Sequence, residues 1–273
     1  MSDAHKEIVL EFQEVTIRFG ETVALDRLSF QVRRGQTWVI LGAAGSGKTV
    51  LLKTAMGLIH PDEGRVLVFG EDITSMKETE LFRIRGEIGM LFQESALFDS
   101  LTIEENVAYP LRNQPGRNFS SDEIQKKVVE ALTFVGLEKT LTKVPSELSG
   151  GMRRRVGIAR ATVTDPPLAM YDSPTAGLDP ITANNIMAFI AKQRDVRHTT
   201  TLIVTQRYQD GILMANYQID PATEKWMPAA DVKNSVMQQT IFIVMQEGRI
   251  AFQGSQAELE ASTGTYVSKF GKT

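Results

Sequence analysis

The sequence predicts an α/β fold in which a mostly parallel sheet is covered by helices. Three observations lead to this prediction. Short apolar segments typical of buried strands alternate with helical segments beyond residue 38. A glycine-rich turn joins the first of those strands to a helix. Residues 8–34, in contrast, have the alternating pattern of an antiparallel β subdomain.

The N-terminal strands come first in the chain. Residues 8–12 and 15–19 alternate apolar and polar side chains, and 24–32 follows a turn at 20–21. Phe19 lies directly before that turn. Its ring can stack on a nucleotide base, or it can be an ordinary core residue, and the local pattern alone favours the core.

The next segment predicts a phosphate-binding loop. Residues 38–41 form an apolar strand that runs into a turn ending in Lys48 and Thr49, and 50–56 continues as a helix. The spacing is G-x-x-x-x-G-K-[ST], in which backbone N–H groups and a helix N-terminus hold phosphate. Lys48 is expected to reach the β- and γ-phosphates, and Thr49 to bind Mg²⁺. A chance match is the alternative, and the flanking strand and helix disfavour it. The residues expected to bind nucleotide here are Gly42, Gly45, Ser46, Gly47, Lys48, Thr49 and Val50.

Two further strands are predicted at 64–69 and 88–92, and the second ends at Gln93. Ligands of open α/β sheets bind outside the carboxyl ends of the strands, so Gln93 is a candidate site residue. Apolar residues at helical spacing then predict a helix over 122–134.

A second anion site is predicted at 148–152. Ser149 has the character of an N-cap for a helix at 153–161, and Gly150 and Gly151 leave that helix N-terminus sterically open. The alternative is a capped helix with a solvated arginine face.

The strand predicted at 168–172 ends in Asp172, a carboxylate positioned to hold Mg²⁺ beside a phosphate loop. A turn at 176–180 leads into the next helix, and the strand at 200–205 ends at Gln206. This alternation of strands and helices is what predicts the helix-covered parallel sheet.

The last third of the chain contains a predicted hairpin, 241–245 with 249–252. The segment before it, 217–240, is polar, carries two prolines and fits neither period. We interpret 217–240 as an excursion from the domain edge, which either contacts an accessory subunit or is a solvated surface segment.

Composition narrows the classes of function. The 273 residues suffice for one large domain, or for a domain with a small appendage. A net charge of −3 gives no reason to expect nucleic acid as a partner. The absence of cysteine excludes disulfides and fits a reducing compartment. Residues 1–7 lack a signal core, and no run of about 18 apolar residues occurs, so the chain is not expected to span a membrane alone.

Taken together, the motifs resemble those of the nucleotide-binding subunits of ATP-binding cassette (ABC) transporters over nearly the whole chain. In that resemblance, 42–49 is the Walker A loop, Gln93 the Q-loop glutamine, 148–152 the signature, 168–172 the Walker B strand, 176–179 the D-loop and Phe19 the base-stacking aromatic residue. The resemblance therefore reverses the preference for a core role of Phe19.

The resemblance implies a P-loop NTPase fold with an N-terminal antiparallel β subdomain and a helical subdomain that carries the signature. The nucleotide-binding domain is expected at 8–256, its helical subdomain at about 94–160, and a C-terminal tail at 257–273. ATP and Mg²⁺ are the implied ligands, and ATP hydrolysis is the implied activity. The implied metal ligands are Thr49, Gln93 and Asp172, and the implied signature-side contacts to ATP are Ser149, Gly150, Gly151 and Asp179.

The stretch 93–111 looks like that of the ATPases paired with MCE-type lipid transporters, the Mla group, although other importer ATPases share parts of it. Members of the ABC family sandwich two ATP molecules between two ATPase subunits, which can be identical or different. The implied partners are a second ATPase subunit and integral-membrane permease subunits, at the cytoplasmic face of the inner membrane.

Two positions depart from the family pattern. The family has Glu after the Walker B aspartate, where this chain has Ser173, and His at the end of the later strand, where this chain has Gln206. A serine hydroxyl is a poor base at neutral pH, and losing a positioned general base lowers the rate by about 10²–10⁴-fold. The candidate catalytic residues are Ser173, Gln206, Gln93 and Lys48.

Three accounts of these departures stay open. The chain can hydrolyse ATP slowly, with Gln206 orienting water as a glutamine does in some GTPases. It can pair with a different, intact ATPase and lend it the signature at 148–152. It can also bind ATP as a clamp without turnover. A modest effect is a further alternative, because Lys48 and Mg²⁺ already handle the transition-state charge.

Overall fold

A central sheet divides the molecule, and its carboxyl edge carries the candidate site. The computed structural model describes residues 7–232 and 239–271. The central sheet has six strands in the order β12-β11-β3-β8-β7-β6. All neighbouring pairs are parallel except β11 and β12, which form the expected hairpin. Its strands are β3 (Thr37–Gly42), β6 (Ile88–Leu91), β7 (Leu168–Asp172), β8 (Thr200–Thr205), β11 (Thr240–Gln246) and β12 (Arg249–Gly254).

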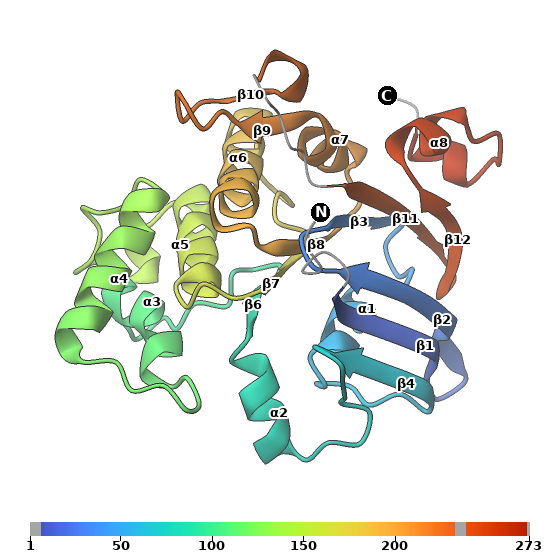
Figure 1. The fold of residues 1–273 in the computed structure, drawn as a ribbon, viewed down its shortest axis with the longest axis horizontal. Coiled ribbons are helices and arrows are strands. Elements are labelled where there is room, and N and C mark those ends of the chain that lie inside the picture. The colour runs from blue at the N-terminus through green and yellow to red at the C-terminus, as the bar shows by residue number, and fades with distance from the viewer. Residues whose placement is uncertain (1–6, 233–238, 272–273) are drawn as a thin grey trace.

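Strand β3 shows why the sheet must be covered on both faces. Its side chains alternate between two buried clusters, as the two-residue period of a strand requires. Val39 and Leu41 pack with the helices on one side, whereas Trp38 and Ile40 pack with the antiparallel sheet and the first helix on the other. In Figure 1 the strands of the central sheet accordingly run between the helices α3, α4 and α5 on the left and the antiparallel sheet on the right.

The antiparallel sheet has the order β2-β1-β4-β5. Its strands are β1 (Ile8–Phe19), β2 (Thr22–Arg33), β4 (Glu63–Val68) and β5 (Glu71–Asp72). The segments expected as two strands, 8–12 and 15–19, form the single strand β1. A bulge between Phe12 and Val15 explains the broken pattern, because both residues are buried although they are three positions apart and a regular strand would place them on opposite faces.

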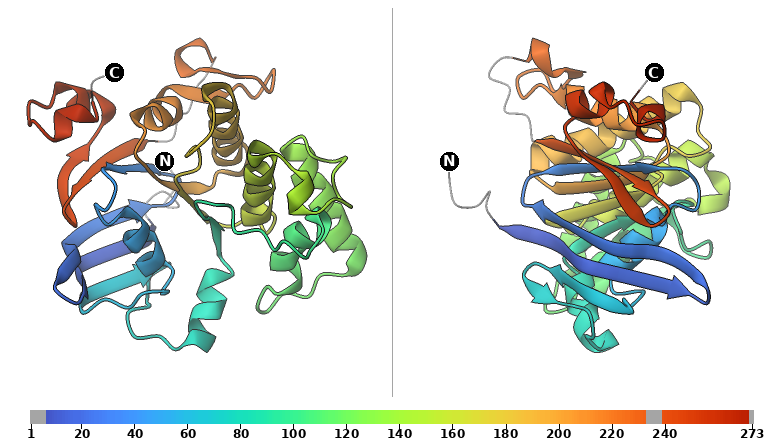
Figure 2. Two further views of the ribbon diagram at one scale, coloured as in Figure 1. Left: turned by 180° about the vertical axis from the view of Figure 1, so that it is seen from behind. Right: turned by 90° about the vertical axis from the view of Figure 1, so that its right-hand side faces the viewer.

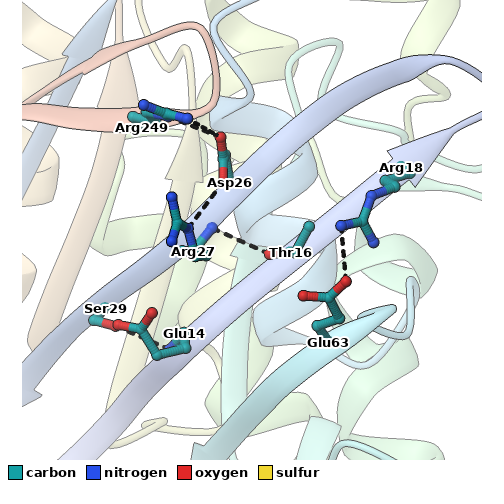
Figure 3. A network of polar contacts seen from close by, with 8 residues as sticks. All are labelled: Glu14, Thr16, Arg18, Asp26, Arg27, Ser29, Glu63 and Arg249. Atoms are coloured by element: carbon teal, nitrogen blue, oxygen red, sulfur yellow. Dashed lines mark hydrogen bonds and ion pairs between the residues drawn. The ribbon is translucent and has the colours of Figure 1, made fainter.

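Polar contacts fix the bulge and tie the antiparallel sheet to the hairpin (Figure 3). The Glu14 N–H, at a φ of 52°, donates to Ser29 Oγ at 2.9 Å. Arg249 of β12 donates to the Asp26 carboxylate of β2 at 2.7 Å. The two sheets are therefore joined through β2 and β12.

The helices include the four expected at 50–56, 122–134, 153–161 and after the turn at 176–180, which are α1, α4, α5 and α6. The helices are α1 (Lys48–Ala55), α2 (Glu78–Arg85), α3 (Ile103–Arg112), α4 (Ser121–Phe134), α5 (Gly150–Thr162), α6 (Pro180–Arg197), α7 (Tyr208–Asn216) and α8 (Gln256–Ala261). The predicted helix 122–134 is confirmed as α4, whose N-terminus is a capping box of Ser120 and Glu123. Helices α3, α4 and α5 pack on one another and form the helical subdomain.

The excursion at 217–240 contains a small hairpin that the sequence reading missed. Strands β9 (Tyr217–Ile219) and β10 (Trp226–Pro228) pair antiparallel. The fully buried Arg194 of α6 donates to the Tyr217 carbonyl at 2.8 Å and so fastens β9 to the domain. The strands were missed because each is three residues long, too short to show a period. Residues 233–238 of the excursion lie outside the described residues.

The segment expected as a C-terminal tail packs on the domain in its described part, to residue 271. Helix α8 contacts both strands of the β11–β12 hairpin, which Figure 2 shows from behind and from the side. Leu259 and Val267 are buried in the same apolar cluster as the helical face of the central sheet. Within the described residues, no helix is both long and apolar enough for a membrane crossing.

Candidate functional site

The phosphate loop, the ends of β6, β7 and β8, and the turn after β1 meet around one cavity of about 640 Å³. The cavity lies at the carboxyl edge of the central sheet, where ligands of open α/β sheets bind. Of the residues expected to act at the site, those lining this cavity are Phe19, Gly45, Ser46, Gly47, Lys48, Thr49, Val50, Gln93, Ser173 and Gln206. Gly42 ends β3 at the entry to the loop, and Asp172 ends β7 beside Thr49.

Glycine at 47 is required by the backbone. Its φ is 99°, a left-handed conformation that a side chain disfavours, and a Cβ there would lie 2.5 Å from the carbonyl oxygen of Ala24. Helix α1 begins at the next residue, so the N–H groups of its first turn point into the cavity. The loop thus offers a cradle of backbone donors to an anion.

Lys48 is folded into that cradle. Its Nζ donates to the carbonyl oxygens of Gly42 at 2.8 Å and Ala43 at 2.7 Å, and to Ser46 Oγ at 3.1 Å. Burial lowers the pKa of Lys48, and the charge of Asp172 opposes that shift. Because only neutral oxygens hold the ammonium group, phosphate oxygens can replace them as stronger, charge-assisted partners.

Thr49 and Asp172 present oxygens suited to Mg²⁺. Thr49 Oγ1 donates to Asp172 Oδ2 at 2.9 Å, and Ser173 Oγ donates to Asp172 Oδ1 at 3.0 Å. The described residues contain no cluster of three or more acidic or imidazole ligands. Mg²⁺ is usually bound by one or two protein oxygens together with phosphates and water, and Thr49 and Asp172 can supply those protein oxygens. Gln93, the third residue expected to bind the metal, lines the same cavity.

Phe19 lies at the rim of the cavity with 53% of its surface exposed. The ordinary core interpretation of Phe19 is therefore wrong. An exposed ring beside a phosphate cradle can serve as a platform for an apolar base.

Ser173 follows the end of β7 with a φ of 49°, and its N–H donates to the Val204 carbonyl at 2.8 Å. Its hydroxyl is a donor to the Asp172 carboxylate, so it is not arranged to accept a proton. Gln206 follows the neighbouring strand β8 and lines the same cavity.

A buried carboxylate that the sequence reading missed connects these two positions. Asp210 of α7 is 1% exposed, and its Oδ2 accepts from Thr175 Oγ1 at 2.7 Å and Thr205 Oγ1 at 2.8 Å. Its other oxygen forms an ion pair at 3.8 Å with Nε of Arg207. Burial raises the pKa of Asp210. In the sequence, Asp210 resembles any acidic residue in the first turn of a helix, so no sequence pattern predicts that it is buried.

Arg154 of α5 is a second connection that the sequence reading missed. Its guanidinium, 7% exposed, donates to the carbonyl oxygens of Phe92, Gln93 and Ala176. Burial lowers the pKa of Arg154. One side chain of the signature helix thus holds both the residue after β6 and the loop after β7.

The signature residues lie around a different cavity of about 720 Å³, which shares no lining residue with the first. Ser149 caps α5 by accepting from the Met152 N–H at 3.2 Å, and Asp179 caps α6 in the same way through Ile181 and Thr182. The expected contacts Ser149, Gly150, Gly151 and Asp179 all line this second cavity. A single chain therefore does not bring the two expected anion sites together.

A third cavity, of about 630 Å³, lies between α2 and the helical subdomain and is mostly apolar. We call it the aromatic groove, and its aromatic lining residues are Phe82, Phe92, Phe98 and Tyr109. Phe82, Phe98 and Tyr109 are exposed, and the guanidinium of Arg160 lies 5.7 Å from the centre of the Phe98 ring. Exposed aromatic side chains gathered in a hollow are typical of protein-binding surfaces.

Comparison with known proteins points to one family. The ABC transporter family model matches residues 25–176. The intermembrane phospholipid transport system ATP-binding protein MlaF of Haemophilus influenzae is 34% identical over 236 residues, which cover 86% of this chain and 89% of that protein. The methionine import ATP-binding protein MetN of Leifsonia xyli is 37% identical over 73% of this chain, but the match spans only 59% of MetN.

A solved structure also superposes well. The dimeric ATP-binding cassette MJ0796, bound to ADP and Pi in a post-hydrolysis state, matches with a TM-score of 0.74 and 27% identity. The match covers 90% of this chain and 98% of that one. The P-loop NTPase fold expected from the motifs is therefore confirmed.

Proposed function

The chain belongs to the ABC transporter family as an ATP-binding subunit, and from that premise we propose that it binds Mg-ATP at a dimer interface and drives phospholipid transport by a partner permease. The observation that carries the proposal is the single cavity lined by Phe19, Lys48 and Thr49, with Asp172 beside it. These residues suit a base, a triphosphate and Mg²⁺ in that order. Phospholipid as the cargo rests on the match to MlaF, which spans 89% of that relative.

The separation of the two cavities supports a dimer. The cradle at Lys48 and the helix N-terminus at Ser149 each offer donors to phosphate, and they line different cavities. A γ-phosphate bound in one chain can reach Ser149 only if another chain presents it. ATP then joins two subunits, and hydrolysis removes the charge that both faces share, which lets the dimer open.

We further propose that intrinsic hydrolysis is weakened. The Ser173 hydroxyl donates its proton to Asp172, the carboxylate expected to bind the metal, so it is not free to act as a base toward water. Gln206 can orient water but cannot remove its proton. A loss of about 10²–10⁴-fold relative to a site with a positioned general base is the expected consequence.

Two other roles remain as alternatives to a slow homodimeric ATPase. A subunit that lacks its own base but keeps Ser149, Gly150 and Gly151 can complete the site of a different, intact ATPase. A subunit that binds Mg-ATP without turnover can act as a nucleotide-gated clamp. Both alternatives rest on the same pair of substitutions, Ser173 and Gln206.

The test compares Ser173→Glu with Ser173→Gln in the purified chain with its permease. We expect slow turnover in the unaltered chain, an increase of about tenfold or more with glutamate, and no increase with glutamine, which matches glutamate in size but is no base. Nucleotide affinity should stay unchanged in both variants. Brisk turnover in the unaltered chain, with no gain from glutamate, would contradict weakened hydrolysis.

The same preparation distinguishes the alternatives. Turnover that appears only when a second, different ATPase is added supports a heterodimer. Mg-ATP binding without turnover in every combination, the Ser173→Glu variant included, supports a clamp. A permease that never co-purifies and never alters turnover would contradict the transport role itself.

A further inference from the structure

The described part of the C-terminal segment, residues 256–271, reaches back to the phosphate loop. Helix α8 and a 3₁₀ turn at Val267–Lys269 pack beside the β11–β12 hairpin. Leu259 and Val267 anchor the segment in the apolar core. Between these anchors lies Tyr266, a half-buried residue whose ring also packs on Phe270, with centroids 5.4 Å apart.

The Tyr266 hydroxyl makes two hydrogen bonds at the start of the phosphate loop. It accepts from the N–H of Ala43 at 3.2 Å and donates to the carbonyl of Met245 at 3.0 Å. Strands β3 and β11 pair in parallel up to Gly42 and Met245, and beyond that pair the loop turns away. A hydroxyl can donate and accept at once. Tyr266 therefore bridges Ala43 and Met245 where direct hydrogen bonding between β3 and β11 has ended.

The peptide group that joins Gly42 to Ala43 is held at both of its polar atoms. Its N–H donates to Tyr266, and its carbonyl accepts from the Lys48 ammonium group at 2.8 Å, as the Ala43 carbonyl does at 2.7 Å. A bound triphosphate would draw the Lys48 ammonium group away from the carbonyl oxygens that now hold it. The bond to Tyr266 does not depend on Lys48, so it can fix the entry to the loop throughout that exchange.

We propose that Tyr266 is a positioning residue that preorganises the phosphate loop, and that the C-terminal segment thereby sets the affinity of the site for nucleotide. The inference rests on the proposed nucleotide site. Tyr266 is bonded neither to Lys48 nor to Asp172 and does not line the cavity of the site. Its loss therefore leaves the saturated turnover number nearly unchanged and raises KM, because a loosened loop must be ordered at the cost of binding free energy.

The test is Tyr266→Phe, which keeps the ring packing and removes both hydrogen bonds. We expect the dissociation constants of Mg-ATP and Mg-ADP, measured by calorimetry, to rise about three- to tenfold, the effect of one or two ordinary hydrogen bonds. KM should rise to a similar extent, with kcat changed by less than about twofold. Hydrogen exchange of the Ala43 amide, followed by mass spectrometry on peptides covering the loop, should accelerate by a similar factor.

Tyr208→Phe is the matched control. The Tyr208 hydroxyl donates to Glu260 of α8 at 2.8 Å, so this variant also removes a tyrosine hydroxyl that holds the C-terminal segment, but at a site away from the phosphate loop. Its nucleotide affinity and Ala43 exchange should match those of the unaltered chain.

Equal effects of the two variants, or no change in affinity with Tyr266→Phe, would overturn the inference and leave the nucleotide site intact. A lower thermal midpoint with unchanged affinity and exchange would overturn it as well. Failure of the unaltered chain to bind Mg-ATP would instead overturn the proposed function, and the inference with it.

Discussion

At the scale of single residues, Asp210 is the clearest case of a group whose role depends on the fold. Its carboxylate holds Thr175, in the loop after β7 that contains Ser173, and Thr205, the last residue of β8 directly before Gln206. Burial raises the pKa of Asp210 above the ordinary value of 3.8. Below the pKa that Asp210 has in the unfolded chain, its protonated carboxyl therefore contributes fully to the stability of the fold. That contribution is lost as pH rises through the raised pKa of the folded chain.

Asp210→Asn tests this sign. The amide oxygen can still accept from both threonines, and the buried charge is gone. We therefore expect the variant to gain stability relative to the unaltered chain as pH rises from the ordinary aspartate value of 3.8 through the raised pKa of Asp210. Urea unfolding at a series of pH values measures the difference. Asp210→Ala, which leaves both hydroxyls without their acceptor, should be less stable at every pH by about 1–3 kcal/mol.

Asp220→Asn is the control with the opposite sign. Hydrogen bonds from Thr223 and Ala222 lower the pKa of the Asp220 carboxyl, so this group stabilises the fold above 3.8 and loses that effect as pH falls. A stability difference for Asp210→Asn with the same pH trend as Asp220→Asn would show that Asp210 is not destabilised as a buried charge.

At the scale of elements, the sequence predicted the strands and helices that have a clear period, and with them most of the site. The strand–turn–helix at 38–56 and the capped helix after Ser149 follow from local chemistry that needs no partner. Contacts across the fold could not be read in the same way. Arg154 is one of three consecutive arginines in the sequence, and only the packing of α5 decides that this one is buried against three carbonyl groups.

A substitution of Arg154 on the signature helix should consequently affect the nucleotide site. Arg154→Met keeps the length of the side chain and leaves buried carbonyl groups without a donor, so we expect the free energy of unfolding to fall by about 1–3 kcal/mol. Because Gln93 and Ala176 lose their common anchor, Mg-ATP turnover should fall as well.

Arg160→Met is the comparison for that variant. Arg160 also lies on α5 and also donates to two carbonyl groups, but these belong to Ser95 and Ala96 in the segment after β6 and not to the loop after β7. The free energy of unfolding of the Arg160→Met variant should fall to a similar extent, while turnover in the isolated chain is retained. Equal losses of turnover in both variants, measured beside the urea midpoints, would contradict a specific linkage by Arg154.

At the scale of the whole molecule, three cavities lie on separate surfaces. In the proposed dimer, the nucleotide cavity and the signature cavity each face a second ATPase chain, whereas the aromatic groove lies between α2 and the helical subdomain and borders Phe92 and Ala96 on either side of Gln93. Phe92 lines the groove, and its carbonyl is held by Arg154. A partner seated in the groove would thus touch a segment that is connected to the nucleotide site, as the coupling of transport to ATP requires.

We therefore expect the permease to bind the aromatic groove. Phe82→Glu places a charge in the apolar hollow, where the ring is 52% exposed in the isolated chain, and should weaken permease binding by about tenfold or more. Val129→Glu, at a position on α4 that is also exposed, at 37%, but lies outside the groove lining, should leave binding unchanged. Co-purification with the membrane subunits measures the first effect, and calorimetry should give the same Mg-ATP affinity for both variants. Normal recovery of the permease with Phe82→Glu would place the membrane partner on another surface, because an unpaired carboxylate could not be buried against it without a large loss of affinity.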